Sequence, residues 1–306
     1  MQRSELNGFA VDLGGTKTAA AKIERGQIIA RHVQPTDGGL DLAGYIRSIE
    51  QILRRVGWTG EKTCLGVTVT GRVSDTGDWA AVNSGTLREI SGVPLANALR
   101  HQFGPQIAVS NDASATTYAE HQFGSGTGCD GFAYITVSTG VGGGLVLGGK
   151  LIQSRSGLAG HFGFSTISSG GPRCGSGRRG TVESLAGGRA VAQQAAEAGY
   201  PGHSAKDVFE AAQRHEAWAV TIADRAAGAI ATLCANLKTM VDPDLIALGG
   251  SIGLSDGFIA RVTEELEQKP VLFRCPVVPA SLGGDGPLLG ALAMAEERGV
   301  NESPDF

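Results

Sequence analysis

The sequence of 306 residues has few charged residues, few aromatic residues and few cysteines. Charged residues make up 18% of the chain, aromatic residues 6%, and there are five cysteines. It contains no run of about 18 apolar residues, so no membrane-spanning helix is expected. It also has no long basic stretch, and its formal net charge is −4, which makes a nucleic acid an unexpected partner.

The cysteines do not form the pattern of a disulfide framework. They stand at positions 64, 129, 174, 234 and 275, an odd number spread over the whole chain. We therefore predict reduced thiols and a cytoplasmic protein. The first eleven residues, MQRSELNGFAV, are polar and lack the apolar core of a signal peptide, which agrees with that expectation.

Glycine, by contrast, is abundant. The 47 glycines occur in short groups after apolar segments, a pattern that indicates functional turns and not a flexible linker. The length favours two domains. Apolar, β-branched stretches that read as strands alternate with segments of helical periodicity, which predicts the α/β class. The expected strands are 9–13, 18–23, 27–32, 63–70, 107–110, 132–137, 142–147 and 245–248, and the expected helices are 41–56, 113–121, 218–241 and 286–298.

One unit of strand, glycine turn, strand and hairpin occurs twice. It opens with Phe9-Ala10-Val11 in the first copy and with Phe132-Ala133-Tyr134 in the second. We favour a duplicated chain, with two similar α/β halves facing each other across a cleft. The alternative is coincidence, because glycine-rich turns between strands are common.

The first glycine turn follows a strand that ends in an acidic residue. In Asp12-Leu13-Gly14-Gly15-Thr16-Lys17, the glycines allow the backbone N–H groups to approach an anion. Thr16 can add a hydroxyl donor and Lys17 a positive charge, while Asp12 would hold Mg²⁺ or its waters. A plain glycine hairpin would show the same local pattern.

Further glycine turns occur later in the chain, which has no Walker A loop. The segment 138–144 reads STGVGGG, and together with the first turn it would grip a nucleotide triphosphate from two sides. Gly249-Gly250-Ser251 follows another strand and would let a base or a ribose lie against the backbone. A helix start explains this third turn equally well.

A carboxylate also follows the strand at 107–110. Asp112 could accept a proton from an alcohol during phosphoryl transfer, and Asn111 could hold a neighbouring hydroxyl. By itself the pair reads more simply as a helix N-cap, where both residue types are favoured.

Taken together, these motifs resemble the ROK family of sugar kinases and repressors, within the actin-like ATPase superfamily. The matching segments are VDLGGTK at 11–17, NDA at 111–113, STGVGGG at 138–144, the loop 157–164, the stretch 174–183 and LGGS at 248–251. The resemblance implies a duplicated actin-like (ribonuclease H-like) ATPase fold, with two domains around a nucleotide and sugar cleft. It places the first domain at 1–110 plus a C-terminal helix at about 287–306, and the second at 111–286.

The resemblance also implies an ATP-dependent sugar kinase that uses Mg²⁺ and acts as a homodimer. Asp112 would be the general base. The sugar would be bound by Asn83, Asn111, His161 and Glu183. The residues around MgATP would be Asp12, Gly14, Gly15, Thr16, Lys17, Thr139, Gly140, Gly249 and Gly250.

The sugar subtype depends on His161. Glucokinases of the family usually carry glutamate there, whereas a histidine resembles the bacterial N-acetylmannosamine kinases, which implies transfer to the 6-hydroxyl of that sugar. A neutral imidazole can donate as well as accept a hydrogen bond. The alternatives are a packing role for His161, a ROK hexokinase for glucose, fructose or N-acetylglucosamine, or a non-catalytic sugar-binding regulator.

The sequence departs from the family at its structural zinc site. Three of the four ligand places hold Phe164, Ser176 and Thr181, and only Cys174 is retained. Because tetrahedral zinc needs about four nitrogen or sulfur ligands, we predict that no zinc is bound. Only eleven residues precede Asp12, so the DNA-binding extension of the family's repressors is not expected either.

Overall fold

The computed structural model describes residues 2–82 and 90–301, with side chains described up to residue 298. The chain divides into two compact units. Unit 1 comprises Met1–Phe123, Gln153–Ala159 and Gly284–Phe306, and unit 2 comprises Gly124–Ile152 and Gly160–Gly283. The domain boundaries predicted from the sequence, at 110/111 and near 287, stay a prediction.

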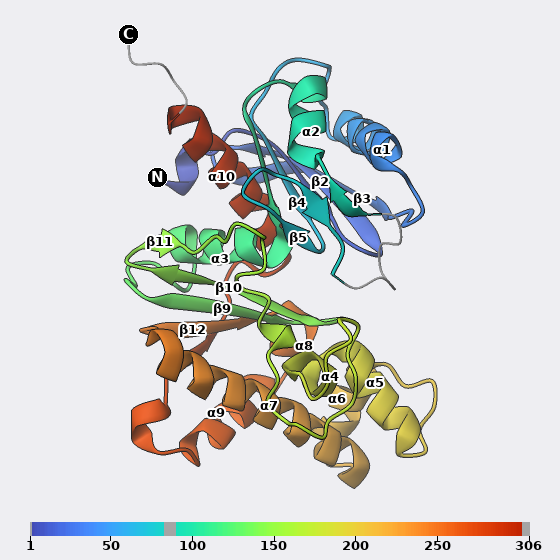
Figure 1. Ribbon diagram of the computed structural model, residues 1–306, viewed down its shortest axis with the longest axis vertical. Helices are drawn as coiled ribbons and strands as arrows, with labels where there is room; N and C mark the ends of the chain where they lie inside the picture. The colour runs from blue at the N-terminus through green and yellow to red at the C-terminus, as the bar shows by residue number, and fades with distance from the viewer. Residues whose placement is uncertain (1, 83–89, 302–306) are drawn as a thin grey trace. The chain divides into compact units, whose positions relative to one another are not determined.

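Each unit is built on a five-stranded sheet (Figure 1). The order in unit 1 is β3-β2-β1-β4-β8, with β1 (Gly8–Leu13), β2 (Lys17–Glu24), β3 (Gln27–Pro35), β4 (Leu65–Val69) and β8 (Ile107–Asn111). The order in unit 2 is β11-β10-β9-β12-β13, with β9 (Phe132–Val137), β10 (Val141–Leu147), β11 (Lys150–Leu151), β12 (Leu245–Gly249) and β13 (Val277–Pro279).

The two sheets share one topology. In each, the first strand pairs antiparallel with a hairpin partner on one side and parallel with a later strand on the other. The paired residues also correspond, since Phe9 lies opposite Leu65 in β4 and Phe132 lies opposite Leu245 in β12. The duplication predicted from the sequence is therefore confirmed.

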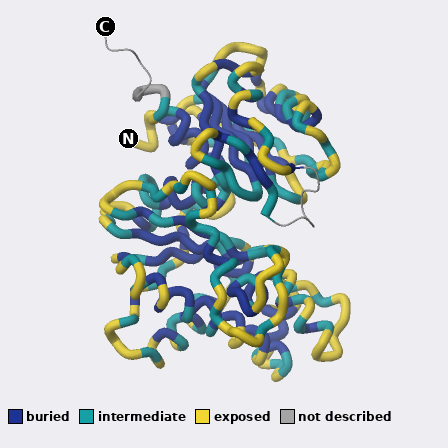
Figure 2. Tube along the Cα trace, viewed as in Figure 1, coloured by how far each residue is buried: buried dark blue, intermediate teal, exposed yellow. Residues whose placement is uncertain are grey.

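Helices cover both faces of the unit 1 sheet. Helices α1 (Leu42–Arg55) and α2 (Leu95–Phe103) enclose the apolar core on one face, where Tyr45 and Ile49 pack with Val67 and Val69 of β4. On the other face α10 (Gly286–Asn301) lies against β1, β4 and β8, and α3 (Asp112–Phe123) packs on α10. Figure 2 shows the strands between them as buried.

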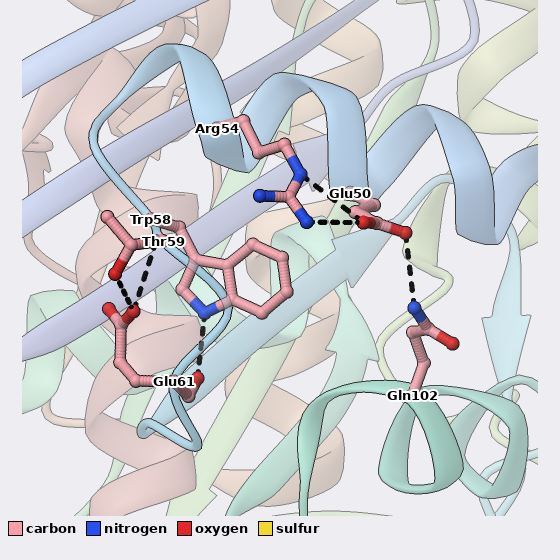
Figure 3. Close-up of polar contacts among 6 residues, drawn as sticks. All are labelled: Glu50, Arg54, Trp58, Thr59, Glu61 and Gln102. Carbon is pink, nitrogen blue, oxygen red and sulfur yellow. Dashed lines mark hydrogen bonds and ion pairs between the residues drawn. The ribbon is translucent and has the colours of Figure 1, made fainter.

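Polar contacts fasten the end of α1 (Figure 3). Glu50 accepts hydrogen bonds from Arg54 in the same helix and from Gln102 of α2, the latter at 3.1 Å. The Arg54 guanidinium also lies 5.1 Å from the centre of the Trp58 ring, and the Trp58 indole donates to the Glu61 carbonyl at 2.9 Å. These contacts fix the turn that leads from α1 towards β4.

A small sheet of β5 (Arg72–Val73), β6 (Trp79–Ala80) and β7 (Ser91–Val93) follows β4. Trp79 is fully buried, packs edge-on against Tyr45, and donates from its indole nitrogen to the Thr70 carbonyl at 2.9 Å. The residue after β4 is thereby held against the core.

Helix α7 (Ala217–Val241) is the centre of the helical layer in unit 2. It packs against α4 (Val182–Ala186), α5 (Gly188–Glu197), α6 (Ala205–Gln213) and α9 (Phe258–Glu267). It ends at Asp242, which has a left-handed backbone with φ of 47°. The buried stripe runs from Ile222 to Leu237, and Met240, which continues the same periodicity, is 65% exposed. The remaining elements are η1 (Arg3–Glu5), η2 (Phe162–Phe164), α8 (Gly250–Gly253), η3 (Val271–Phe273) and η4 (Gly283–Asp285).

None of the five cysteines, all of which lie in the described part of the chain, is part of a disulfide bond. Among the helices in the described part of the chain, none combines the length and apolarity that crossing a membrane requires.

The close approach of α3 and α10 depends on glycine. A Cβ atom at Gly290 would stand 1.9 Å from the Ala115 carbonyl oxygen, and one at Gly286 would stand 2.6 Å from Cγ2 of Thr116. Because α3 begins at Asp112, this contact also sets the position of the predicted base.

We predict that Gly290→Ala destabilises the protein by about 3 kcal/mol, because the methyl group would push α3 away from α10. Urea denaturation measures the change. The matched control is Gly228→Ala in α7, where a Cβ would meet only Glu265 at 3.6 Å. A helical alanine there should be neutral or stabilising by about 0.5–1 kcal/mol. Equal effects of the two substitutions would contradict the helix contact.

Candidate active site

Asp12 lies in the middle of the unit 1 sheet, near the carboxyl end of β1. It is directly opposite Thr68 in β4, and the Thr68 hydroxyl donates to its carboxylate at 2.9 Å. Desolvation by burial, reinforced by the negative charge of Asp112, raises the pKa of Asp12 to about 6. One or two carboxylates together with substrate phosphates are a usual magnesium environment, so Asp12 fits the role predicted for it.

The turn after β1 leads straight into β2. The Gly14 N–H donates to the Lys17 carbonyl at 3.0 Å, and a Cβ at Gly14 would stand 2.7 Å from that oxygen, which requires glycine. Thr16 and Lys17 are exposed. The turn therefore presents a hydroxyl and an ammonium group beyond the end of the strand that carries Asp12.

Asn111 and Asp112 lie at the end of β8, where α3 begins. The Asn111 side-chain oxygen accepts from the N–H groups of Ala113 and Ser114, at 3.0 and 3.1 Å, and its amide donates to the Gly71 carbonyl at 2.8 Å. Asn111 therefore caps the helix, whereas the Asp112 carboxylate accepts from the adjacent Ala113 N–H at 2.8 Å. The sequence analysis considered a helix N-cap role for both Asn111 and Asp112, and in the structure this role is mainly that of Asn111.

Desolvation by burial raises the pKa of Asp112 above the ordinary aspartate value. Hydrogen bonds from the Ala113 N–H and from the side chains of Asn111 and Thr70 offset part of this rise, because they stabilise the charged form. The position at a helix N-terminus also favours a negative charge. A carboxylate whose pKa lies above its usual range is a better proton acceptor while it remains ionised near neutral pH.

In unit 2 the turn between β9 and β10 contains Thr139 and Gly140. The start of α5 supports this turn, since the Gly188 N–H donates to the Ser138 carbonyl at 2.7 Å and the Arg189 N–H to the Thr139 carbonyl at 3.2 Å. Thr139 is exposed. The loop thus keeps its shape through backbone contacts and leaves the Thr139 hydroxyl accessible.

The glycine turn after β12 lies beside this loop. The Ser251 and Ser138 hydroxyls are 3.0 Å apart. Gly250 has φ of +85°, and a Cβ there would stand 2.4 Å from the Val137 carbonyl oxygen. A Cβ at Gly249 would meet the Tyr134 hydroxyl at 2.5 Å. Both glycines are therefore required by close packing against β9, and the predicted nucleotide-binding residues of unit 2 form one group.

Glu183 reaches the same loop from α4. Its Oε2 atom accepts from the Val141 N–H at 3.2 Å, and a Cβ at Gly140 would stand 2.4 Å from that oxygen. Desolvation by burial raises the pKa of Glu183, while the Val141 N–H and the charge of Arg189 act in the opposite direction. The structure thus brings a residue predicted to bind sugar next to residues predicted to bind nucleotide.

His161 precedes the short helix η2 in the loop that the sequence singled out. Its ring stacks on Phe164, with the ring centres 6.0 Å apart and the planes at 18°. The next residue, Phe162, is buried and packs on Gly143, where a Cβ would stand 2.5 Å from the phenyl ring. Gly143 therefore has a packing role that its position in a phosphate-type loop does not reveal.

Two of the residues at the family's zinc places form a hydrogen bond, since the Cys174 thiol lies 3.0 Å from the Ser176 hydroxyl. Burial raises the pKa of Cys174, but hydrogen bonding with Ser176 and Thr181 outweighs burial and lowers the pKa overall. Within the residues that the structure describes, no group of three or more His, Cys, Asp or Glu side chains is arranged to hold a metal ion. The donor set here does not fit zinc.

The structure brings the predicted residues together in two groups, one in each unit. In unit 1 these are Asp12, the turn 14–17, Asn111 and Asp112, and in unit 2 they are Thr139, Gly140, Glu183, Gly249 and Gly250. His161 lies on a loop that packs on β10. Asn83, also predicted to bind sugar, lies outside the described residues.

One threonine of β4 was missed by the sequence analysis. The Thr68 hydroxyl donates to the Asp12 carboxylate at 2.9 Å. The available signal was a threonine between two valines inside an otherwise buried strand.

Comparison with known proteins shows the family to which the chain belongs. A sequence model described as the ROK family matches residues 8–298. The chain belongs to the ROK family. Among solved structures, a ROK hexokinase from Thermus thermophilus superposes with a TM-score of 0.80, at 29% identity over 96% of this chain and 99% of that one. A ROK glucokinase from Streptomyces griseus, in complex with glucose and AMPPNP, gives 0.81 at 27% identity over 95% and 99%. The fold is the duplicated actin-like ATPase fold predicted from the sequence.

Two kinases of one named sugar are similar to this chain over most of its length. An N-acetylmannosamine kinase from Vibrio cholerae is 37% identical over 292 residues, which is 95% of this chain and the full length of that protein. An N-acetylmannosamine kinase from Haemophilus influenzae is 36% identical over 92% of this chain and 93% of its own length.

We predict that Asp12→Asn stabilises the protein at pH 7.5 by on the order of 1–2 kcal/mol in the absence of ligands. The folded state raises the pKa of Asp12 from 3.8 to about 6, so ionisation above that pH opposes folding. The advantage of asparagine should shrink as the pH falls from 7.5 to 4.5, because wild-type Asp12 then becomes protonated.

Urea denaturation at both pH values measures this effect. Asp75→Asn, which removes an exposed carboxyl group, is the matched control and should change stability by less than about 0.5 kcal/mol. The prediction is contradicted if Asp12→Asn is less stable than the wild type at pH 7.5, or if its increase in the free energy of unfolding does not depend on pH. Either result would show that burial does not destabilise the ionised form of Asp12.

Proposed function

We propose that this protein is an ATP-dependent kinase that phosphorylates the 6-hydroxyl of N-acetylmannosamine. The observation that carries the chemistry is the placing of Asp12 and Asp112 at the same edge of one sheet, the first ionised beside a glycine turn and the second at a helix N-terminus. The N-acetylmannosamine kinases among the relatives support the choice of sugar.

Asp112 is the general base in this proposal. Its carboxylate accepts the proton of the sugar hydroxyl as that oxygen attacks the γ-phosphorus, and the bond to the leaving ADP breaks. The raised pKa of Asp112 favours this transfer. MgATP supplies the phosphoryl group, and Asp12 would hold Mg²⁺ or its waters, while the N–H groups of the turn 14–17 contact phosphate oxygens.

His161 and Glu183 give the sugar its orientation in this proposal. A neutral imidazole at His161 can donate to the N-acetyl carbonyl or to a neighbouring hydroxyl, which a glutamate in the same place could not do. Glu183 can only accept while ionised, and its position is fixed by the Val141 N–H. In the same proposal the nucleotide is bound by Thr139, Gly140 and the turn at 249–250.

Several finer features belong to the same proposal. The carboxylate at Asp12 supports the use of Mg²⁺. Five cysteines without a disulfide among them support a cytoplasmic location. The homodimer implied by the family resemblance stays a prediction, and so does the absence of zinc.

A coupled assay of ADP release tests the substrate. MgATP is combined with N-acetylmannosamine, N-acetylglucosamine, glucose, mannose or fructose, and kcat/KM for N-acetylmannosamine should exceed the others by about tenfold or more, equivalent to ~1.4 kcal/mol. A higher kcat/KM for glucose or another hexose would keep the kinase class and reject the role given to His161.

Asp112→Asn is the matched variant for that assay. It should lose turnover and retain sugar binding by calorimetry, since asparagine keeps the shape of the side chain but cannot accept the proton. Turnover comparable to wild type would exclude Asp112 as the base. Sugar binding without any turnover in the wild-type protein would favour the non-catalytic regulator.

We predict that removal of metal ions leaves the folded protein intact. Dialysis against a chelator should change Tm by less than about 2 °C, because Phe164, Ser176 and Thr181 occupy the ligand places and the Cys174 contacts are hydrogen bonds. Differential scanning fluorimetry with metal analysis of the dialysate checks this. A large fall in Tm with stoichiometric release of zinc would refute it.

A further inference from the structure

The first residue of β10, Val141, contacts both the Glu183 side chain and the loop that carries His161. Its N–H donates to the Glu183 carboxylate at 3.2 Å. Its carbonyl oxygen lies against Gly163 in η2, where a Cβ atom would stand 2.1 Å from that oxygen. Because Gly163 follows His161 by two residues, the backbone of one strand residue fixes the surroundings of two side chains that are predicted to bind sugar.

The backbone that follows His161 is also held at its far end. The Ser165 N–H donates to the Phe162 carbonyl at 3.0 Å, and the Ser165 carbonyl accepts from the Val182 N–H at 3.0 Å. Phe162 is buried against Gly143 of β10. The Cα atoms from His161 to Ser165 therefore have little freedom to move.

A fixed backbone does not by itself orient an imidazole. The His161 side chain can rotate about two bonds, and rotation about the second changes the plane of the ring. The ring N–H bond lies in that plane, so the plane decides which atoms the imidazole can donate to. The His161 ring stacks on Phe164, with the ring centres 6.0 Å apart and the planes at 18°.

Phe164 is placed so that it can set this plane. Its N–H donates to the His161 carbonyl at 3.2 Å, so the two residues lie at opposite ends of one turn. Offset stacking of aromatic rings at centre distances of about 4.5–7 Å is favourable, so tilting either ring away from its neighbour costs free energy. The phenyl ring has no hydrogen-bonding group, so it can hold the imidazole without occupying either ring nitrogen.

We propose that Phe164 is a positioning residue that determines sugar specificity, because its ring holds the His161 imidazole in the plane in which the N–H group donates to the N-acetyl carbonyl of the sugar. This inference rests on the proposed function, in which His161 binds that sugar. Phe164 acts only through His161. A hexose without the N-acetyl group does not use this hydrogen bond, so Phe164 affects the choice among sugars and not the rate of phosphoryl transfer.

The test compares Phe164→Leu, which removes the ring, with Phe164→Tyr, which retains it. In Phe164→Leu the KM for N-acetylmannosamine should rise about threefold to tenfold, the range for loss of one aromatic pair, with kcat and the KM for ATP within about twofold. The ratio of kcat/KM for N-acetylmannosamine to that for mannose should fall by the same factor. Phe164→Tyr should keep each constant within about twofold of wild type.

The matched control is Tyr200→Leu. It also removes one ring of a stacked pair in unit 2, since the Tyr200 and Trp218 ring centres are 3.9 Å apart with the planes at 14°. This substitution should leave the kinetic constants for both sugars unchanged. Should Phe164→Leu fold poorly, Phe164→Met gives the same comparison with the tyrosine variant.

A double-mutant cycle separates an effect through His161 from a general loosening of the loop. In a His161→Ala background, Phe164→Leu should change the Kd for N-acetylmannosamine by less than about twofold, because the imidazole that it orients is absent. A loss as large as that in the wild-type background would overturn the proposal. So would an unchanged KM in Phe164→Leu, or a fall in kcat with KM unchanged.

Measurements without turnover separate this inference from the proposed function. Calorimetry without ATP gives the Kd for N-acetylmannosamine, and the Hε1 resonance of His161, assigned by its loss in His161→Ala, reports the stacking. Phe164→Leu should shift this resonance and raise Kd about threefold to tenfold. If the wild-type protein binds the sugar without turnover, the kinase proposal fails, and this rise in Kd would still support the inference.

Two further outcomes would reject the inference. An unchanged resonance and Kd in Phe164→Leu, with an active wild-type protein, would reject it and leave the proposed function intact. A wild-type protein that binds no N-acetylmannosamine would reject both.

Discussion

Much of unit 1 depends on keeping two like charges at one edge of a sheet. Asp12 and Asp112 are both partly desolvated, and burial raises the pKa of each. Such an arrangement opposes folding near neutral pH, and it persists because the surrounding structure is fixed on every side. Thr68 of β4 donates its hydroxyl to Asp12, Asn111 caps α3, and Gly290 lets α10 pack directly on that helix.

The duplicated topology has been adapted to different chemistry in the two units. Both sheets have a hairpin followed by parallel strands. In unit 1 the turn after the first strand follows an aspartate, whereas in unit 2 the corresponding turn at Thr139 and Gly140 is supported by the amides of α5 and by Glu183. The same topology thus places an aspartate before the glycine turn in unit 1 and a glutamate against the glycine turn in unit 2. Different residues around one kind of turn give the two units different functional groups.

Most strands and helices could be predicted because their patterns are local. The helix at 42–55 has its N-cap at Asp41 and a buried stripe that is visible in the sequence, and β1 and β9 are short apolar runs. Met240 is an exception, because it continues the helical periodicity of α7 and is nevertheless exposed. The roles of Gly143 and Gly290 could not be predicted either, since each is decided by a partner from a distant part of the chain, Phe162 and Ala115.

The sequence by itself determined the α/β class, the duplication and the family, because the order and spacing of the glycine turns and of Asn111-Asp112 are properties of the chain. It also determined that three zinc ligand places hold residues unsuited to zinc. Only the tertiary structure decided that Asn111 and not Asp112 caps α3, and that the Thr68 hydroxyl donates to Asp12. The physical reason is that strand register and side-chain hydrogen bonds join residues some 40 to 60 positions apart, and no local pattern specifies which groups will meet.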